Sequence, residues 1–494
     1  MGSLINNERV KLYKKPSTWI LIGIIVGLTL LSLLLSELLD GMSFYTYTWQ
    51  DSYKSDLEYY VSELENDPEN TDLQAQADIV RYHLTHEIPP TDWRTDAIAQ
   101  YYSLTYRVNA NGMNSWAVSE TDETIIDQRI RALESILDSG DWRGFVQLQI
   151  DDLQSGRTPS ANDQEKQVDI DILTLYLDQD IVPSAQGDGR FFYDDTQSQS
   201  ADAWKNQAVQ SVRANKLALI RGTDDNGNLL TNSQRAARQR EIDVAMERLA
   251  TNTPPVESDS FLGKLENTTS SLEMVSLLLI VLAGGIISTE FSSGTVKLLL
   301  ITPHRRRSIF WAKAILLLEV SLITVASIFV LSFLISGAFT AFQGIGAMQV
   351  MTLFGQVVRF PYLLYIVLRC MLMTLPVFAY GALALMLSAV TRKSGVSIAV
   401  SLLLMFGSEI VMAMLAALSS QFGVIPGIKF LLFANTQLGN YLPTAYQMWT
   451  QGMSFSPSLV DPSMTLGFSV VILLIYTVCF LWIARDSFCR RDIK

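Results

Sequence analysis

Six long apolar segments constrain the fold of this 494-residue chain more than any other feature. Each has about 18 or more mostly apolar residues, and roughly 20 helical residues cross the hydrocarbon core of a bilayer. Backbone groups in lipid must bond to one another, so each segment is predicted to be a helix. The chain is therefore predicted to be an all-α polytopic membrane protein with spans at residues 18–39, 270–288, 313–337, 362–390, 394–416 and 464–484.

Charge is divided sharply along the chain. Residues 40–269 hold 40 of the 49 acidic residues but 19 of the 37 basic ones, a net charge of −21, whereas the rest has a net charge of +9. This long polar insert between the first two spans is predicted to be a separate acidic domain. The asymmetry indicates two compartments, and it predicts no nucleic-acid partner.

Lysine and arginine set the predicted orientation, because the loops that carry them stay in the cytoplasm. Basic groups precede the first span, follow the second, separate the fourth from the fifth and follow the sixth. All four groups lie on one side if the N-terminus is inside. The prediction is a multi-pass cell-membrane protein with residues 1–17, 289–312 and the tail 485–494 in the cytoplasm and residues 40–269 and 417–463 outside.

Three terminal or loop segments allow alternatives. The first span could be a signal peptide, but it is long and lacks a small-x-small cleavage pattern after it. Residues 1–17 suit either a solvated basic tail or an interfacial helix on lipid; the helix is the prediction. Residues 417–463 are too apolar for a free loop and too broken to span. We expect a re-entrant pair of short helices there, with a buried lid as the alternative.

The external segment reads as mostly α-helical. In residues 121–140, isoleucine and leucine recur at helical spacing, Thr121 is a candidate cap and Gly140 a candidate stop. The three cysteines all lie outside residues 40–269, so this domain must be held by its own apolar core rather than by disulfides.

Motifs for catalysis are absent from the sequence. There is no GxxxxGK[ST] phosphate loop, HExxH, CxxC or GxSxG, so the chain is not predicted to be an enzyme or to bind a metal or cofactor itself. His83 and His86 have helical spacing, but further ligands cannot be named, and exposed polar positions are the preferred interpretation.

The connection between spans two and three, residues 289–312, is patterned beyond what orientation requires. Its arginines follow the positive-inside rule, but the preceding GTVKLLLITP predicts a short amphipathic helix over about 292–302 that ends at Pro303. Val296, Leu299 and Leu300 share one face of that helix. A short apolar helix held at the membrane surface suits docking into a groove on another protein.

Here the sequence resembles the permease subunits of ABC-2 type transporters. The resemblance lies in an acid–Gly-Thr–Leu–Pro–Arg–Lys pattern, in both chain ends and in the broken external segment before the last span. It covers residues 1–39 and 270–494; the large insert departs from compact family members. The pattern positions are Glu290, Gly294, Thr295, Leu298, Pro303, Arg305 and Lys313.

That resemblance implies a membrane subunit of an ATP-driven exporter. It would make residues 289–312 the coupling-helix region, which docks on a separate ATP-binding subunit that carries ATP and Mg²⁺. It also implies a second permease chain, identical or related, and an amphipathic cargo such as a peptide, lipid or drug. The predicted contacts to the ATP-binding subunit are Glu290, Gly294, Thr295, Val296, Leu298, Leu299, Pro303 and Arg305.

Charged residues within the predicted spans form a second candidate site. Glu319, Arg369 and Glu409 fall in spans three, four and five. A charge facing lipid at mid-bilayer costs about 2.5–3.5 kcal/mol on insertion scales, so these groups are expected to face protein or a transport path. Arg369 and Glu409 lie at matching depth, which permits either a structural pair or a polar path lining.

Two carboxylates and a pair of glycines lie within the predicted spans as well. Glu37 and Glu273 lie near the predicted outer ends of spans one and two and carry no predicted role. Gly284 and Gly285 allow close helix approach, within the chain or across a dimer seam. The competing functional class is a membrane sensor whose external domain binds a ligand, and an ATPase partner would separate the two.

Overall fold

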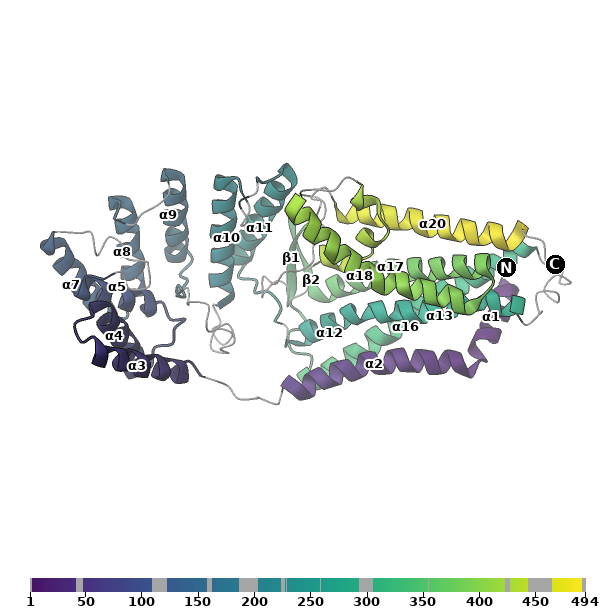
Figure 1. Cartoon of the computed structure of the whole chain (residues 1–494), viewed down its shortest axis with the longest axis horizontal. Helices are drawn as coiled ribbons and strands as arrows, with labels where there is room; N and C mark the ends of the chain where they lie inside the picture. Colours follow the sequence, from purple (N-terminus) through teal and green to yellow (C-terminus); the bar gives the residue numbers. More distant parts are fainter. Residues whose placement is uncertain are drawn as a thin grey trace. The chain divides into compact units, whose positions relative to one another are not determined.

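The computed structural model describes residues 2–40, 48–108, 122–157, 162–185, 203–223, 227, 229–257, 259–292, 305–353, 355–422, 427–442 and 464–490. Contacts divide the chain into two units (Figure 1). One unit, here called the bundle, comprises Met1–Met42, Pro255–Gln349 and Arg359–Lys494. The other, here called the external domain after its predicted location, comprises Ser43–Pro254 and Val350–Val358.

The bundle is built from long apolar helices. Six segments in the described part of the chain are long and apolar enough to cross a membrane, which confirms the prediction of an all-α polytopic membrane protein. They follow a short N-terminal helix, α1 (Gly2–Tyr13). The spans are α2 (Pro16–Asp40), a composite second span, α16 (Arg306–Thr340), α17 (Tyr362–Thr391), α18 (Ser394–Phe422) and α20 (Leu466–Arg490).

The composite second span differs from its prediction. It runs through α12 (Phe261–Ser270), the 3-10 turn η2 (Ser271–Glu273), α13 (Met274–Ile286) and α14 (Ser288–Ser292). The span therefore begins well before residue 270, and residues 255–269 belong to the bundle rather than to the external domain. Lys264 and Glu266 lower the mean hydropathy of this part of the span, so the prediction from the sequence did not include it.

Helix α17 lies at the centre of the packing and contacts α13, α16, α18 and α20. Glycine permits the close approach. A Cβ at Gly284 would lie 2.6 Å from Ile398, and one at Gly381 would lie 2.5 Å from Leu279. The Ser388 hydroxyl also donates to the Gly284 carbonyl over 2.8 Å. Gly284 thus allows close packing within the chain. In membrane proteins such small residues let helix backbones approach closely, and van der Waals packing then holds the helices together.

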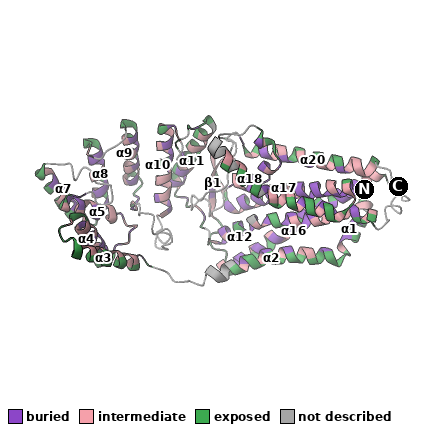
Figure 2. Ribbon diagram, viewed as in Figure 1, coloured by how far each residue is buried: buried purple, intermediate pink, exposed green. Residues whose placement is uncertain are grey.

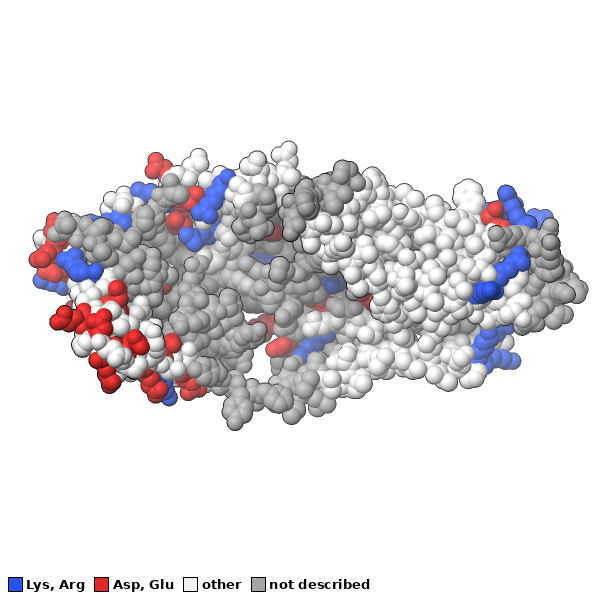
Figure 3. All heavy atoms as spheres, in the orientation of Figure 1, with Lys and Arg blue, Asp and Glu red and all other residues white. Residues whose placement is uncertain are grey.

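The outer faces of the bundle remain apolar. Trp19, Leu403 and Trp482 have 57%, 71% and 65% of their surface exposed, and Figure 2 shows exposed residues along α2 and α20. In Figure 3 the middle of the visible bundle surface is nearly free of charge, whereas charged side chains, mostly basic, gather at the end where both chain ends lie. An apolar belt of this kind is the surface expected of a protein that faces lipid.

The external domain is a run of helices in which each packs against the next along the chain. This sequential stacking resembles the arrangement of solenoid proteins, in which contacts are made chiefly to neighbours. The prediction of a mostly helical domain is thus met within the described residues. The helices are α3 (Trp49–Asn66), α4 (Thr71–His86), α5 (Arg94–Tyr106), α7 (Glu123–Ser139), α8 (Trp142–Ser155), α9 (Asp163–Asp178), α10 (Ala203–Arg221) and α11 (Asn232–Thr251).

Local signals fix these helices. The cap of α7 is Asp122, one residue after the predicted Thr121, because the Asp122 side chain accepts from the Thr124 N–H; the helix ends before Gly140, which is in the left-handed region, as predicted. Its buried Arg129 pairs with the buried Asp152 of α8. Burial lowers the pKa of Arg129 to about 10, although Asp152 opposes that shift.

Two segments complete the fold. A hairpin of β1 (Met348–Leu353) and β2 (Gln356–Pro361) joins α16 to α17. In the predicted re-entrant segment, residues 427–442 form the 3-10 turns η3 (Ile428–Phe430), η4 (Phe433–Asn435) and η5 (Leu438–Tyr441), rather than α-helices. These turns pack against α17 and α20. Residues 443–463 lie outside the described residues.

Candidate functional site

A buried ion network joins three segments at the end of the bundle where the chain ends lie. Lys313, on the second turn of α16, is 1% exposed. Its Nζ donates to Glu8 Oε2 of α1 and to Glu290 Oε1 of α14, each over 2.7 Å. Lys11 Nζ donates to the other oxygen of Glu8 over 2.7 Å. We call these four residues the ion network.

Charge balance stabilises the ion network despite its burial. Two ammonium groups face two carboxylates, and Lys11 also lies 4.0 Å from Glu290. Burial by itself raises the pKa of Glu8, but Lys313 and Lys11 together hold that pKa below its ordinary value of 4.5. Glu8 is therefore a charged partner at neutral pH, and α1 is held against α16 by ion pairs.

A second ion pair adds to this docking. Arg9 Nε donates to Glu319 Oε2 over 2.8 Å, with 46% and 20% of the two side chains exposed. Glu319, which was predicted as an intramembrane charge, thus meets a partner on α1. Glu8 and Arg9 are consecutive residues of α1, and each forms an ion pair with a residue of α16.

The predicted coupling residues divide into described and undescribed positions. Gly294, Thr295, Val296, Leu298, Leu299 and Pro303 lie outside the described residues, and the predicted helix at 292–302 with them. Glu290 is in α14, and Arg305 precedes the first residue of α16 in extended conformation. Glu290 and Lys313, the first and last positions of the sequence pattern, contact each other directly.

Sequence reasoning missed Glu8 as a member of this site. The only available signal was an acid within an otherwise basic N-terminal segment, and that signal does not identify a partner 305 positions away.

A second buried cluster lies near the N-terminal end of α17. Glu266 of α12 and Tyr362 are each 0% exposed, and the Tyr362 hydroxyl donates to Glu266 Oε2 over 2.7 Å. Arg369 Nη1 lies 3.5 Å from Glu266 Oε1 and donates to the Leu442 carbonyl over 2.6 Å. The cluster joins α12, α17 and the segment after η5.

Arg369 therefore has Glu266 as its carboxylate neighbour within the described side chains. The predicted partner Glu409 lies in α18, but its side chain is outside the described set, so the Arg369–Glu409 pair stays a prediction. The arrangement around Glu266 fits a structural pair that fixes one span against another. Glu266 could not be named from the sequence because it was assigned to the external domain.

Helix α4 carries His83 and His86 in its last turn. His83 was expected to be exposed, but it is 0% exposed, and its Nδ1 lies 2.8 Å from the Ile88 carbonyl just past the helix end. That expectation was wrong because the α4 C-terminus folds over the imidazole. Burial lowers the pKa of His83. The described residues contain no group of three or more His, Cys, Asp or Glu placed to bind a metal ion.

Two relatives of known sequence are similar to about half of this chain, and one of them is described as a membrane protein. Over 241 residues the chain is 28% identical to the uncharacterized membrane protein YdbK of Bacillus subtilis (strain 168), covering 48% of this chain and 85% of that protein. Over 222 residues it is 29% identical to the uncharacterized protein YhcI of the same organism, covering 44% of this chain and 65% of that protein.

The family described as "Protein of unknown function (DUF2705)" matches residues 245–494. This range includes the last five of the six spans, the Glu266 cluster and both Glu290 and Lys313. With its six candidate spans and its membrane-protein relative, the chain is a multi-pass membrane protein that belongs to the DUF2705 family of proteins of unknown function.

Proposed function

We propose that this chain is the membrane subunit of an ABC-2 type exporter that moves an amphipathic substrate and takes its energy from ATP hydrolysed on a separate subunit. In this proposal both chain ends face the cytoplasm, as the basic loops predict. The chain supplies no ATPase motif, so ATP and Mg²⁺ belong to the partner subunit. A second permease chain, identical or related, completes the pathway.

The observation that carries the proposal is the ion network. The connection between spans two and three leaves the described structure at Ser292 and returns at Arg305. Lys313 ties the start of that connection, through Glu290, to the third span, and also to α1 through Glu8. A partner that pushes on the connection would therefore move α1, α14 and α16 together rather than one loop alone.

This linkage supports transmission of force, because buried ion pairs of good geometry resist separation more than solvated ones do. An ordinary positive-inside loop needs basic residues but needs no buried lysine between two carboxylates. The ABC-2 pattern also begins at Glu290 and ends at Lys313, so the residues that carry the resemblance are the residues that meet.

Copurification tests the proposal. The full chain should retain an ATP-binding subunit from its native membrane in mild detergent, identified by its phosphate-binding motif. Changing Leu299→Glu and Leu300→Glu should abolish that retention by placing charge on the predicted apolar face. Ile345→Glu, at a 44% exposed apolar position in the turn after α16, is the matched control for added charge and should retain the subunit.

Unchanged retention by the doubly charged variant would refute the coupling-helix assignment. Absence of any ATP-binding subunit from the wild-type preparation would instead favour the sensor interpretation, in which the external domain binds a ligand and no ATPase is required.

A further inference from the structure

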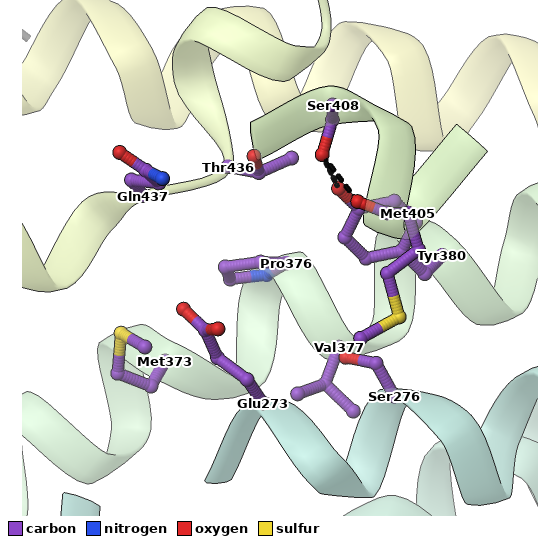
Figure 4. Close-up of a pocket in the computed structure, with 10 residues that line it drawn as sticks. All are labelled: Glu273, Ser276, Met373, Pro376, Val377, Tyr380, Met405, Ser408, Thr436 and Gln437. Atoms are coloured by element: carbon purple, nitrogen blue, oxygen red, sulfur yellow. Dashed lines mark hydrogen bonds between the residues drawn. The ribbon is translucent and has the colours of Figure 1, made fainter. Parts of the chain in front are cut away.

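A small cavity with one carboxylate lies among the long helices of the bundle (Figure 4). Glu273 and Ser276 face it from η2 and α13, and Ser408 and Thr436 face it from α18 and the residue after η4. Its volume is about 30 Å³, which is room for about two water-sized groups.

The cavity lies at the middle of the spans rather than near their ends. Pro376, in its wall, is near the midpoint of α17, and Ser408 is near the midpoint of α18. The composite second span, Phe261–Ser292, also has its midpoint beside Glu273 and Ser276. Glu273 was expected near the outer end of its span; the earlier start of that span at Phe261 corrects this.

Two of the helical segments that line the cavity are irregular there. The 3-10 turn η2 interrupts the second span immediately before α13, and Pro376 removes a backbone donor inside α17. Breaks in spanning helices are tolerated where they line a cavity, and transporters place their binding sites at such breaks near the bilayer midplane.

The polar groups at the cavity form an acceptor-rich set. Ser408 donates its hydroxyl hydrogen to the Met405 carbonyl, and Thr436 donates its own to the Phe433 carbonyl. Their hydroxyl oxygens therefore offer lone pairs, as the Glu273 carboxylate does. The Ser408 oxygen also lies 3.4 Å from the Tyr380 hydroxyl, which takes up one of its lone pairs and, with the Gln437 amide, adds donors to the lining. Glu273 is the one charged group among the lining residues, so the cavity disfavours anions and suits a cationic donor.

The exposure of Glu273 points the same way. Its side chain is exposed on the surface of the bundle at mid-span, where a carboxylate facing lipid is costly. We therefore expect the exposed side of Glu273 to face water or a polar group rather than lipid. The Met373, Val377 and Met405 side chains form an apolar wall beside it, which suits the carbon atoms that follow a charged head group.

We propose that this cavity binds a primary ammonium group, with Glu273 as its counter-ion and the Ser408 and Thr436 oxygens as hydrogen-bond acceptors. An ammonium group carries three N–H donors for such acceptors, and the volume admits an –NH₃⁺ group more readily than a trimethylammonium group. As a site for cargo, this inference rests on the proposed exporter function and names a cationic amphiphile as its substrate class. Binding itself requires no ATPase.

The test uses the purified full chain in neutral detergent and isothermal titration with hexylammonium chloride. Wild-type protein should bind hexylammonium more tightly than hexanol or hexyltrimethylammonium. Glu273→Gln should weaken binding about tenfold, the effect of losing a charge-assisted hydrogen bond. Glu257→Gln, which changes an exposed carboxylate before the second span, is the matched control and should bind as wild type does.

Ser408→Ala provides a second test if Glu273→Gln proves unstable, and it should weaken binding about fivefold through loss of a neutral acceptor. Equal binding of hexanol and hexylammonium, or wild-type affinity in both cavity variants, would overturn the proposal. Displacement of hexylammonium by sodium chloride alone would also overturn it, in favour of an inorganic cation site. Copurification of an ATP-binding subunit is independent of every one of these results.

Discussion

Replacing Lys313 with methionine should show whether the ion network contributes more to the free energy of unfolding than a solvent-exposed ion pair does. The change removes an ammonium group that is 1% exposed and that bonds to two carboxylates, and it keeps a side chain of similar length. Glu8 and Glu290 would then be left with 7% and 13% of their side chains exposed and without their shared cation.

Breaking a buried pair by removing one partner costs about 3–5 kcal/mol. Lys11 still bonds to Glu8 and lies 4.0 Å from Glu290, so it offsets part of that loss. We therefore expect Lys313→Met to lower the free energy of unfolding by about 3 kcal/mol, at the lower end of that range. Arg9→Gln breaks a pair with a 46% exposed arginine, and it should cost about 0.5 kcal/mol.

The assay is equilibrium unfolding of the full chain in mixed micelles, with each variant compared with wild type at one pH and salt concentration. A triple variant, Glu8→Leu, Glu290→Leu and Lys313→Met, removes all buried charge at once and should recover stability to within about 1 kcal/mol of wild type. The reasoning is refuted if Lys313→Met costs no more than Arg9→Gln, because the network would then be no stronger than a solvated pair.

Three further results are expected. The pKa of folded Glu8 lies below 4.5, so its contribution to docking α1 is present above about pH 4.5 and is lost as the pH falls through the lowered pKa. Hydrogen exchange of the α1 amides should therefore accelerate as the pH falls through that range. The Glu8→Gln variant should show no such acceleration. Tyr362→Phe removes a hydrogen bond to a buried carboxylate and should lower the free energy of unfolding by about 2 kcal/mol, whereas Tyr476→Phe, at an exposed hydrogen bond, should lower it far less. Arg129→Met leaves Asp152 buried with only the more distant Arg157; it should destabilise the external domain by about 3 kcal/mol, seen as faster limited proteolysis of the full chain than for Arg131→Met, an exposed change on the same helix.

The spans could be predicted because each depends on local composition alone. An apolar run long enough to cross a bilayer has few other folds open to it, so α17 and α18 begin at the predicted residues 362 and 394. The second span was placed too late for the same reason. Lys264 and Glu266 are charged and therefore suggested an external segment. Glu266 is nevertheless fully buried, next to the Tyr362 hydroxyl and Arg369.

The candidate sites could be predicted only in part, because their members are distant in sequence. The pattern from Glu290 to Lys313 was visible, but their direct contact and the third partner Glu8 depend on how α1 packs against α16. Glu273 was misplaced because its depth follows from the start of α12 at Phe261. A burial pattern fixes a helix, whereas pairing between helices needs the packed structure.

The second span connects the two sites physically. Glu273 lies at the start of α13, and Glu290 lies in α14 beyond its end, about 25 Å away along a helix with a rise of 1.5 Å per residue. Between them, Gly284 holds α13 against Ile398 of α18, and Ser388 of α17 donates to the Gly284 carbonyl. These contacts couple α13 to α17 and α18, since a close-packed interior transmits strain between neighbouring helices. Under the proposed function, a push on the connection after Ser292 reaches the cavity as a displacement of α13 against α17 and α18, the helices that carry Pro376 and Ser408.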